Sequence, residues 1–459
     1  MKNNFRLFSK LFVASLLAAF ALPFALQAET VPFTSSALGE QEQVSIKSGT
    51  STSTQPGYGI EKSFDGNKST LYHSTWGSTS FPVTLTYYLT TASNIDYFIY
   101  NTRMDGSSNG NFREFDVRVR EAGTTTFTKV LTKNLNGASG SWKVFFDTTQ
   151  VNIDAVQFYI RTGAGDGNGF AACTEMEFYK LKEGAFNPLS IFTDAACTTL
   201  KTGVTRDNIN AINNPFYKQL ALDLLDQSYT TEFRIQHYKA WPHPDDFSRN
   251  NRVGTYSLCD NPTGIFVRQG DTVIVMVDDI YDVPVSLTLK NYNKPGGNGY
   301  WENSYYGLSK GANRIVADRD GLFYVFYHST ALHTTVPQVK IHFAYGKVNG
   351  YFDSEKHSAA DWSRILSATK YEYFDALGKY AHLSYPTAHF KKNALTSGPQ
   401  LVANYNELVQ MQREFMGYYK FPNRDPKNRS HFVVMYHSYM YSTSYHTGYE
   451  VGTMDGLTN

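Results

Sequence analysis

Short runs in which apolar and polar residues alternate cover the chain between residues 31 and 182. Residues 83–87, 115–119 and 156–160 are clear examples, and Gly, Ser and Asn residues separate the runs. Side chains that alternate in this way are typical of β-strands with one buried face. Because no helical period interrupts these evenly spaced runs, the pattern predicts that residues 31–182 form an antiparallel β-sandwich.

The periodicity changes after residue 187. Asn214 and Pro215 are typical of the start of a helix. Behind them, an apolar residue recurs at every fourth position, which predicts an amphipathic helix (Phe216, Leu220, Leu224).

Strand patterns dominate residues 264–345. Runs at 264–267 and 272–277 flank a turn at Gly270 and Asp271, and together they predict a β-hairpin. Further alternating runs predict strands at residues 285–289, 322–327 and 339–343. We therefore expect a second β-sandwich in this part of the chain.

Helical features return in residues 357–459. Ser358 and Asp361 have the spacing of a capping box. A further amphipathic helix is predicted by four spaced apolar residues (Leu401, Tyr405, Leu408, Phe415), and a last strand by residues 431–435. The chain then stops at Asn459 without a helix cap or a closing turn. We expect a multidomain, β-rich protein in which residues 187–459 are a truncated, mixed α/β region, a second β-sandwich with helices.

The first 28 residues have the organisation of an export signal. They contain three cations and no acid, and an apolar run at residues 11–26 precedes a small-residue cleavage site at Ala28. Pro23 interrupts the run, which is shorter than the roughly 20 residues of a membrane-spanning helix. We predict a signal peptide at 1–28, no transmembrane segment after its removal, and a location that is secreted, periplasmic or on the cell surface.

The charge balance excludes one broad class of function. The chain of 459 residues has 42 Lys and Arg residues and 41 Asp and Glu residues. Removal of the signal peptide leaves 39 cations against the same 41 acids. A protein this close to neutrality does not bind nucleic acid through bulk charge, so no such partner is expected. Its three cysteines can form at most one disulfide, and their spacing fits no zinc motif (Cys173, Cys197, Cys259).

A polar segment at residues 65–70 offers oxygen ligands for a hard cation. Asp65, Asn67 and Thr70 are close in sequence, and calcium takes about six to eight oxygen ligands. The segment is not a helix–loop–helix calcium site, because Thr70 and Trp76 stand where that motif needs Gly and Glu. An Asx-turn that closes a hairpin is the alternative interpretation.

Several aromatic and polar residues fall in the predicted loops of the first domain, where they could converge on one rim (Tyr72, His73, Trp76, Arg103, Asn111, Phe170). Sugars are bound by an aromatic face together with a few fixed polar groups. Taken singly, each residue has a simpler interpretation, such as Trp76 in the core or Arg103 in a surface ion pair.

The sequence of residues 57–76 closely resembles the opening of the discoidin domain, also called the coagulation-factor-5/8 type C domain. The resembling residues are Gly57-Tyr-Gly59-Ile-Glu61-Lys-Ser63-Phe64-Asp65-Gly66-Asn67-x-Ser69-Thr70-x-Tyr72-His73-Ser74-x-Trp76. The resemblance continues through Tyr100-Asn-Thr-Arg103, Asn109-Gly110 and Phe115, and it ends at Ala172-Cys-Thr-Glu175-Met-Glu177-Phe178-Tyr179. It therefore covers most of the first domain.

This resemblance implies a jelly-roll-like β-sandwich, and bacterial members of the family are mostly carbohydrate-binding modules. It implies a structural calcium held by Asp65, Asn67 and Thr70, with Glu175 from the last strand. Asn67 stands where many relatives have Asp. The resemblance further suggests a set of sugar contacts, with hydroxyls bound by polar side chains and a ring stacked on Phe170 (His73, Arg103, Asn111). Phospholipid or protein binding, known for animal relatives, is the competing use.

Residues 187–459 resemble the N-terminal part of the enhancin-like, mucin-targeting zinc metallopeptidases. The segments that carry the resemblance are 264–275, 311–316, 321–327, 342–352, 361–362, 440–441 and 445–449. Members with this layout are secreted by gut bacteria and viruses and cleave heavily glycosylated proteins. The resemblance therefore implies a bacterial protein whose partners are glycans of glycoproteins, with mucin-type O-glycans foremost.

The zinc motif of such an enzyme does not occur in this sequence. Zinc peptidases of this type hold the metal with two His residues four positions apart and use the adjacent Glu as a general base. None of the 12 histidines has a partner four residues away, and no His-Glu dipeptide occurs. We therefore assign no catalytic residue, and zinc is expected only if a further C-terminal part exists. The chain is expected to be the targeting front half of such a peptidase; the alternative is a free-standing, non-catalytic glycan-binding or host-surface adhesion protein.

Overall fold

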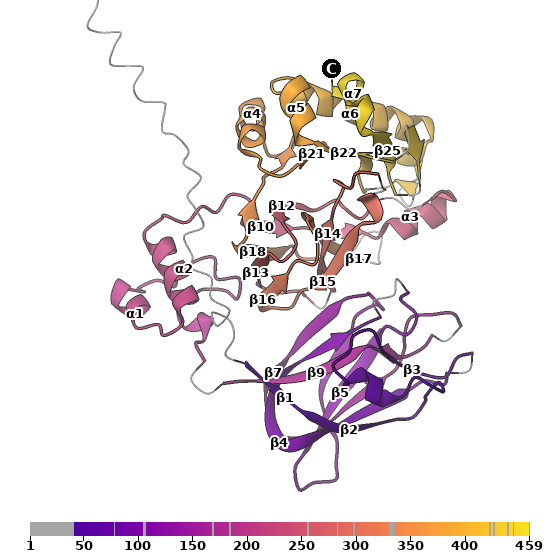
Figure 1. Ribbon diagram of the computed structural model, residues 1–459, viewed down its shortest axis with the longest axis vertical. Helices are drawn as coiled ribbons and strands as arrows, with labels where there is room; N and C mark the ends of the chain where they lie inside the picture. Colours follow the sequence, from indigo (N-terminus) through magenta and orange to yellow (C-terminus); the bar gives the residue numbers. More distant parts are fainter. Residues whose placement is uncertain are drawn as a thin grey trace, which may run out of the picture.

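The computed structural model describes residues 41–458, apart from short gaps (78, 104–106, 168, 183–184, 255–256, 282, 297–298, 330–335, 422–423, 426, 438–439 and 444). The predicted signal peptide lies outside the described residues. Figure 1 shows three units stacked along the long axis of the molecule: a β-sandwich at the bottom, a second sandwich in the middle, and a sheet covered by helices at the top.

The first unit is the predicted N-terminal sandwich. Its main sheet has the order β1-β9-β4-β7-β5-β6, with β2 paired to β4. The strands are β1 (Gln41–Val44), β2 (Ile46–Ser51), β4 (Val83–Asn101), β5 (Glu114–Glu121), β6 (Thr128–Asn134), β7 (Ser141–Ile160) and β9 (Glu175–Leu181). A short second ladder pairs β3 (Tyr72–His73) with β8 (Ala172–Cys173). The register of β4 against β7 shifts between Tyr88 and Tyr97, and such irregularities bend long strands.

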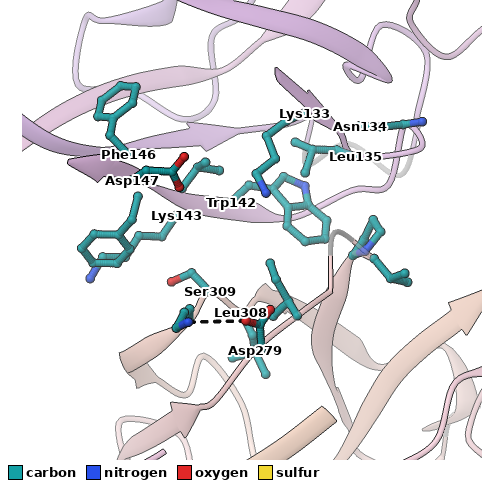
Figure 2. Close-up of a pocket in the computed structure, with 16 residues that line it drawn as sticks. Lys133, Asn134, Leu135, Trp142, Lys143, Phe146, Asp147, Asp279, Leu308 and Ser309 are labelled. Carbon is teal, nitrogen blue, oxygen red and sulfur yellow. Dashed lines mark hydrogen bonds and ion pairs between the residues drawn. The ribbon is translucent and has the colours of Figure 1, made fainter. Parts of the chain in front are cut away.

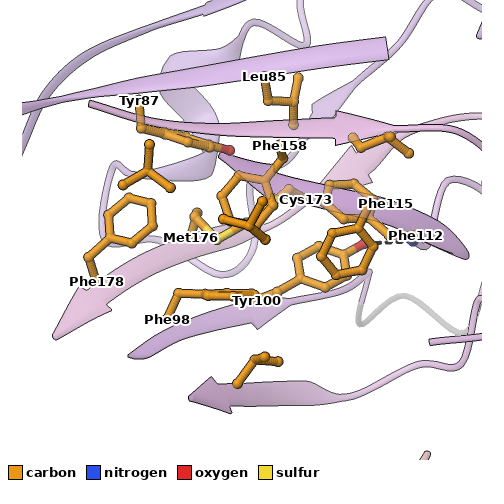
Figure 3. Packing of buried hydrophobic residues seen from close by; sticks show 14 of the residues in the cluster. Leu85, Tyr87, Phe98, Tyr100, Phe112, Phe115, Phe158, Cys173, Met176 and Phe178 are labelled. Carbon is orange, nitrogen blue, oxygen red and sulfur yellow. Dashed lines mark hydrogen bonds between the residues drawn. The ribbon is translucent and has the colours of Figure 1, made fainter. Parts of the chain in front are cut away.

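Aromatic rings fill the core of this sandwich (Figure 3). Phe158 lies at its centre, with ring centroids 5.1 Å from Phe98, 6.0 Å from Tyr87 and 6.3 Å from Phe178. The alternation that predicted β7 places Val156, Phe158 and Ile160 on this buried face.

The second unit is the second sandwich expected from the strand patterns. One sheet has the order β10-β18-β13-β16, and the other the order β15-β14-β17-β12-β19. The strands are β10 (Ile235–Tyr238), β12 (Pro262–Val267), β13 (Thr272–Val277), β14 (Val285–Lys290), β15 (Asn303–Gly307), β16 (Gly311–Val316), β17 (Gly321–Ser329), β18 (Val339–Tyr345) and β19 (Lys347–Val348); β11 (Trp241–Pro242) pairs with β17. The helices are α1 (Arg206–Asn210), α2 (Pro215–Leu225) and α3 (Pro244–Asn251).

Helix α2 begins as the sequence predicted, because the Asn214 side chain accepts hydrogen bonds from the amides of Phe216 and Tyr217. Its apolar face covers the outer side of the first sheet, where Phe216 and Leu220 share a cluster with Ile274 and Met276. Burial on both faces explains why β13 is apolar almost throughout.

The predicted hairpin at residues 264–277 is wrong in its pairing. Strands β12 and β13 form at the expected positions, but β12 pairs with β17 and β19. Strand β13 pairs instead with β16 and β18 in the opposite sheet. The turn at Gly270 and Asp271 therefore connects the two layers of the sandwich. The local pattern of a hairpin and that of such a crossing are the same, so only long-range pairing distinguishes them.

The third unit is an α/β layer, in agreement with the mixed α/β region expected, and it has more strands than the one predicted at residues 431–435. Its sheet has the order β20-β21-β22-β23-β25-β24. The strands are β20 (Phe352–Asp353), β21 (Tyr373–Leu377), β22 (Ala381–Pro386), β23 (Ser430–Met435), β24 (Met440–Ser442) and β25 (Thr447–Glu450). The helices are α4 (Ala359–Ala368), α5 (Thr387–Asn393), α6 (Gly398–Phe415) and α7 (Met454–Thr458). Strands β21 and β22 are buried on both faces, so they lack the alternation by which exposed strands are recognised.

Two predicted helices of this unit are present. Ser358 and Asp361 form the expected capping box at the start of α4. Helix α6 buries Val402 and Val409, whereas two of the residues that predicted its apolar face, Leu408 and Phe415, are exposed. Apolar residues lie on both sides of this helix, so the sequence pattern did not identify the buried one.

A buried polar network joins the second and third units. The carboxylate of Asp375 on β21 accepts hydrogen bonds from Tyr324 of β17, at 2.9 Å, and from Ser384 of β22, at 2.6 Å. His382 contacts the same carboxylate through Nε2 at 2.8 Å. His431 of β23 stacks on His382 with 4.3 Å between ring centroids. All five side chains are almost completely buried, so the network holds two sheets together across their interface.

The same interface contains a second stacked pair and a buried cation. The His446 ring lies 3.8 Å from the ring of Tyr300, and Lys290 donates a hydrogen bond to the Tyr300 carbonyl at 3.0 Å. Burial lowers the pKa of His446 to about 3, and the Lys290 charge adds to this effect. Burial also lowers the pKa of His431, with His382 and His446 adding to the shift. Both rings are therefore neutral in the folded protein at neutral pH.

We predict that acidification destabilises this interface. An unfolded histidine titrates near 6.5, so the unfolded chain binds protons at His431 and His446 that the folded chain excludes. Stability is therefore fully present above about pH 6.5 and is lost as the pH falls from there towards the lowered folded values. Each unit of pKa difference corresponds to about 1.4 kcal/mol. Urea unfolding at pH 7.5 and pH 5 measures the loss.

A variant separates this effect from general acid sensitivity. His446→Phe keeps a ring that can stack on Tyr300 but cannot take up a proton, so its stability should fall less between pH 7.5 and pH 5. The exposed His237→Phe is the matched control and should fall as much as the unmodified protein. Equal pH dependence in all three proteins would contradict the prediction.

Candidate ligand-binding site

Three of the predicted rim residues come together at one end of the first sandwich. His73 lies on β3, Trp76 follows it, and Phe170 precedes β8. The pairing of His73 with Ala172 brings the two segments side by side. The His73 ring lies 5.3 Å from Phe170 and 6.0 Å from Trp76, measured between ring centroids.

Trp76 is held in place although half of it is exposed. Its side chain is 52% exposed, yet its indole Nε1 lies 3.2 Å from Nδ1 of His73. The backbone amide of Trp76 donates to the Gln55 side chain at 2.9 Å, and the Tyr58 ring lies 5.3 Å away. A large exposed apolar ring that is fixed on its other side is suited to binding a ligand face.

Glycines position Phe170 at this rim. A Cβ at Gly163 would lie 1.8 Å from the Phe170 carbonyl oxygen, and one at Gly165 would lie 2.6 Å from its ring. The loop therefore requires glycine at both positions to bring its backbone against Phe170. This accounts for the Gly-rich run at residues 163–169.

Arg103 and Asn111 differ in their burial and in their hydrogen bonds. The Arg103 guanidinium is half-buried and donates to the Asn109 carbonyl at 3.3 Å. Asn111 is fully buried, and its amide donates to the Gly137 carbonyl at 3.2 Å and to the Ser139 hydroxyl at 3.0 Å. Asn111 thus fastens neighbouring loops together, whereas the partly exposed Asn109 lies beside Arg103.

Tyr72 belongs to the core rather than to the rim. Its side chain is fully buried, and its hydroxyl donates to the Ser53 carbonyl. Burial raises the pKa of Tyr72 above its ordinary value. Tyr58 and Asn109 were not predicted as site residues. Both could have been found from the sequence, because they are an aromatic and a polar residue in predicted loops of the first domain.

The segment at residues 65–70 is closed by its own side chains. Asp65 accepts a hydrogen bond from the Asn67 amide at 2.9 Å, and Asn67 accepts one from the Ser69 amide at 3.0 Å. Both are Asx-turns, the alternative left open by the sequence. The Thr70 hydroxyl donates to Asp65 at 2.8 Å.

Glu175 meets this segment from the first position of β9. Its Oε1 accepts from the Gly66 amide at 3.2 Å, but its Oε2 is buried without any hydrogen-bond partner. Burial raises the pKa of Glu175 above its ordinary value, and the charge of Asp65 adds to the rise. A buried carboxylate oxygen without a partner is unfavourable, and a bound cation would provide the partner that it lacks.

The oxygen atoms around Glu175 fit a hard cation rather than a transition metal. The carboxylate of Asp65, the side chain and carbonyl of Asn67 and the hydroxyl of Thr70 are the oxygen donors that calcium prefers. Zinc requires several His, Cys or acidic side chains. Within the described ranges, no group of three or more His, Cys, Asp or Glu residues could hold a metal ion.

The structure also describes the three cysteines and the helices that a membrane span would require. The three cysteines are buried and unbridged, so the one disulfide that the sequence allows is not formed. Among the helices of the described residues, none has the length and apolar character that a membrane span requires.

Comparison with known proteins identifies the first unit and the overall fold. The family description "F5/8 type C domain" matches residues 48–176. A search of curated proteins found no match. A solved metallopeptidase from Bacteroides thetaiotaomicron is 25% identical over 59% of this chain and 47% of its own, with a TM-score of 0.54.

Two structures from Clostridium perfringens are also similar. One contains the CBM32-1, CBM32-2 and M60 catalytic domains of ZmpB; it is 18% identical over 90% of this chain and 47% of its own, with a TM-score of 0.50, and shows the fold alone. The other is the family 32 CBM of NanJ, solved in complex with galactose; it is 22% identical over 30% of this chain and 100% of its own, with a TM-score of 0.28.

The chain spans about half the length of the two metallopeptidase structures. Its three units share the fold of part of such an enzyme, and its first unit contains an F5/8 type C domain at residues 48–176.

Proposed function

We propose that the protein binds glycans at the rim formed by His73, Trp76 and Phe170. The observation that carries this proposal is the half-exposed Trp76 ring, which is fixed by His73, Gln55 and Tyr58 before any ligand arrives. A pyranose presents C–H groups on one face and hydroxyls at its edge, so it needs an apolar ring beside polar side chains. Arg103 donates to the Asn109 carbonyl, and the adjacent Gly110 carbonyl accepts from the Ala172 amide at 2.7 Å, so these polar groups lie near the segment that carries Phe170.

We further propose that this rim delivers a zinc metallopeptidase to O-glycosylated, mucin-type proteins outside the bacterial cell. The metallopeptidase-like fold of the chain supports this proposal. Because the His-Glu-x-x-His pattern is missing from this sequence, the zinc ligands would belong to a segment that the sequence does not contain. A host-surface adhesion protein would bind its partner through protein contacts, so free sugars would not compete.

We also propose that the first sandwich binds calcium at residues 65–70 and Glu175. Calcium at Asp65, Asn67, Thr70 and Glu175 would give Glu175 Oε2 a partner and would offset the burial and the Asp65 charge that raise the pKa of Glu175. Because β9 and the loop before β3 would both hold the ion, calcium would tie the last strand of the sandwich to the rim.

We predict that Trp76→Ala weakens binding of galactose and N-acetylgalactosamine by about five- to tenfold, because a stacked aromatic ring contributes about 1–1.5 kcal/mol. Arg103→Ala should abolish binding without unfolding the domain, because it removes the charged guanidinium donor beside the rim. Isothermal titration calorimetry measures the affinities, and circular dichroism checks the fold.

Two matched controls accompany these variants. Trp301 is 55% exposed but lies in the second sandwich, and Arg113 is an exposed arginine of the first sandwich. Trp301→Ala and Arg113→Ala should bind as the unmodified protein does. Unchanged affinity in both Trp76→Ala and Arg103→Ala would reject the rim as the binding site.

We predict that calcium raises the melting temperature of the first sandwich and that Glu175→Gln removes this shift. Without calcium, in the presence of a chelator, stability should instead depend on pH, because a carboxyl whose pKa is raised in the folded protein stabilises the fold when it is protonated. The apo protein should therefore lose stability as the pH rises through that folded pKa, and calcium should restore it. Thermal melts of the unmodified protein, Glu175→Gln and the exposed control Glu114→Gln test this. A calcium shift that persists in Glu175→Gln would contradict the assignment.

We predict that the peptidase is active only in the native secreted protein. Its intact mass should exceed that of residues 29–459, and it should cleave an O-glycosylated peptide in a zinc-dependent manner. The polypeptide 29–459 alone should bind the same glycopeptide without cleaving it. A native mass that equals residues 29–459 would instead support the free-standing glycan-binding protein.

A further inference from the structure

A cavity of about 400 Å³ lies between the first and the second sandwich (Figure 2). One wall is the start of β7 and the end of β6, with Lys133, Trp142 and Lys143. The facing wall comes from the second sandwich, with Asp279, Leu308 and Ser309. Binding sites for small ligands are commonly about 300–1,000 Å³ and are often found between domains, so both the size and the place of this cavity suit a ligand.

The two walls are held together by a close backbone contact. A Cβ at Gly307, the last residue of β15, would lie only 2.3 Å from the Ser141 carbonyl oxygen and 3.3 Å from the Trp142 ring. The contact therefore requires glycine at this position, and it fixes β15 against β7. The cavity opens directly beside this contact, so its walls are already positioned without a ligand.

The cavity combines apolar surfaces with a few polar groups. Phe145 and Phe146 line the first wall, and Ile280, Val283 and Leu308 line the second. Ser309 adds a buried hydroxyl, which donates to the Asn313 side chain at 3.1 Å and keeps its lone pairs as acceptors. A pyranose ring needs this combination, because its C–H faces pack on apolar groups while its hydroxyls require hydrogen-bond partners.

The charges of the cavity lining favour an anion, because three lysines (Lys133, Lys143 and Lys310) and two aspartates (Asp147 and Asp279) leave a formal excess of one positive charge. Lys310 and Asp279 neutralise each other across an ion pair of 3.4 Å. Lys143 has no such partner: its Nζ lies 4.3 Å from the Tyr97 ring centroid and 4.8 Å from that of Phe145. Within the described residues, no carboxylate forms an ion pair with it. Burial lowers the pKa of Lys143 to about 8, so its ammonium group is still mostly charged at neutral pH.

We propose that this cavity binds an acidic sugar, a pyranose that carries a carboxylate or a sulfate, and that Lys143 is its anion-binding residue. The ligand would give the half-buried ammonium group the opposite charge that it lacks, and the apolar walls would hold the ring. Because both sandwiches line the cavity, a bound sugar would also restrain the first sandwich relative to the rest of the chain.

This site is separate from the rim at His73, Trp76 and Phe170, because none of the rim residues lines the cavity. The two proposals can therefore fail independently. Neutral sugars should bind at the rim alone, whereas acidic sugars should also bind in the cavity.

The test uses the chain from residue 29 to 459 and three probes: the methyl glycoside of N-acetylneuraminic acid, galactose 6-sulfate and unmodified galactose. We expect at least one acidic probe to bind. Lys143→Met should weaken this binding about tenfold, because it removes a charged partner but keeps the length of the side chain. Val283→Trp should weaken it further by filling the cavity, and it leaves every charge in place.

A control variant is tested with the same three probes. Lys47→Met, which replaces an exposed lysine of the same sandwich, should bind the acidic probe as the unmodified protein does. Comparison of the carboxylate and sulfate probes decides which anion is accepted. The proposal would be overturned if neither acidic probe bound, if Lys143→Met bound with unchanged affinity, or if an acidic peptide displaced the sugar from the cavity more readily than galactose 6-sulfate did.

Discussion

The short ladder between β3 and β8 determines the arrangement of the functional end of the first sandwich. Only Tyr72 and His73 pair with Ala172 and Cys173, yet this pairing joins segments that are about a hundred residues apart in the sequence. It places Phe170 against His73 on one side. On the other side it brings Glu175 to the amide of Gly66. The rim and the cation segment therefore depend on the same two pairs of residues.

Two buried carboxylates show different solutions to the same physical problem. Asp375 receives hydrogen bonds from a tyrosine and a serine and contacts a histidine, so its charge is balanced by the protein itself. Glu175 has a single amide donor for one oxygen and none for the other. Burial is costly for an unpaired charge, so the arrangement at Asp375 is complete, whereas one oxygen of Glu175 is left without a donor. This contrast is the physical basis for proposing a metal at Glu175 and none at Asp375.

The two interfaces between the units differ in how completely side chains fill them. The second and third units share a polar and aromatic interface in which histidines, tyrosines and Asp375 are almost completely buried. The first and second units meet at the close contact of Gly307 with Ser141, and a cavity remains beside it. The junction of the first two units therefore leaves a cavity, whereas buried side chains fill the junction of the second and third units.

The sequence alone determined the elements whose causes are local. The alternation in residues 83–87 and 156–160 is a property of single strands, and the caps at Asn214 and Ser358 act within a few residues, so these predictions were confirmed. The motifs at residues 57–76 and 172–179 likewise indicated the F5/8 type C domain that the comparison found. Tertiary structure decided what depends on distant partners. It placed β12 and β13 in opposite sheets, hid β21 and β22 between two layers, buried Asn111 and Tyr72, and built the cavity beside Lys143. Each of these outcomes depends on which surface covers a residue, and a pattern within one segment does not contain that information.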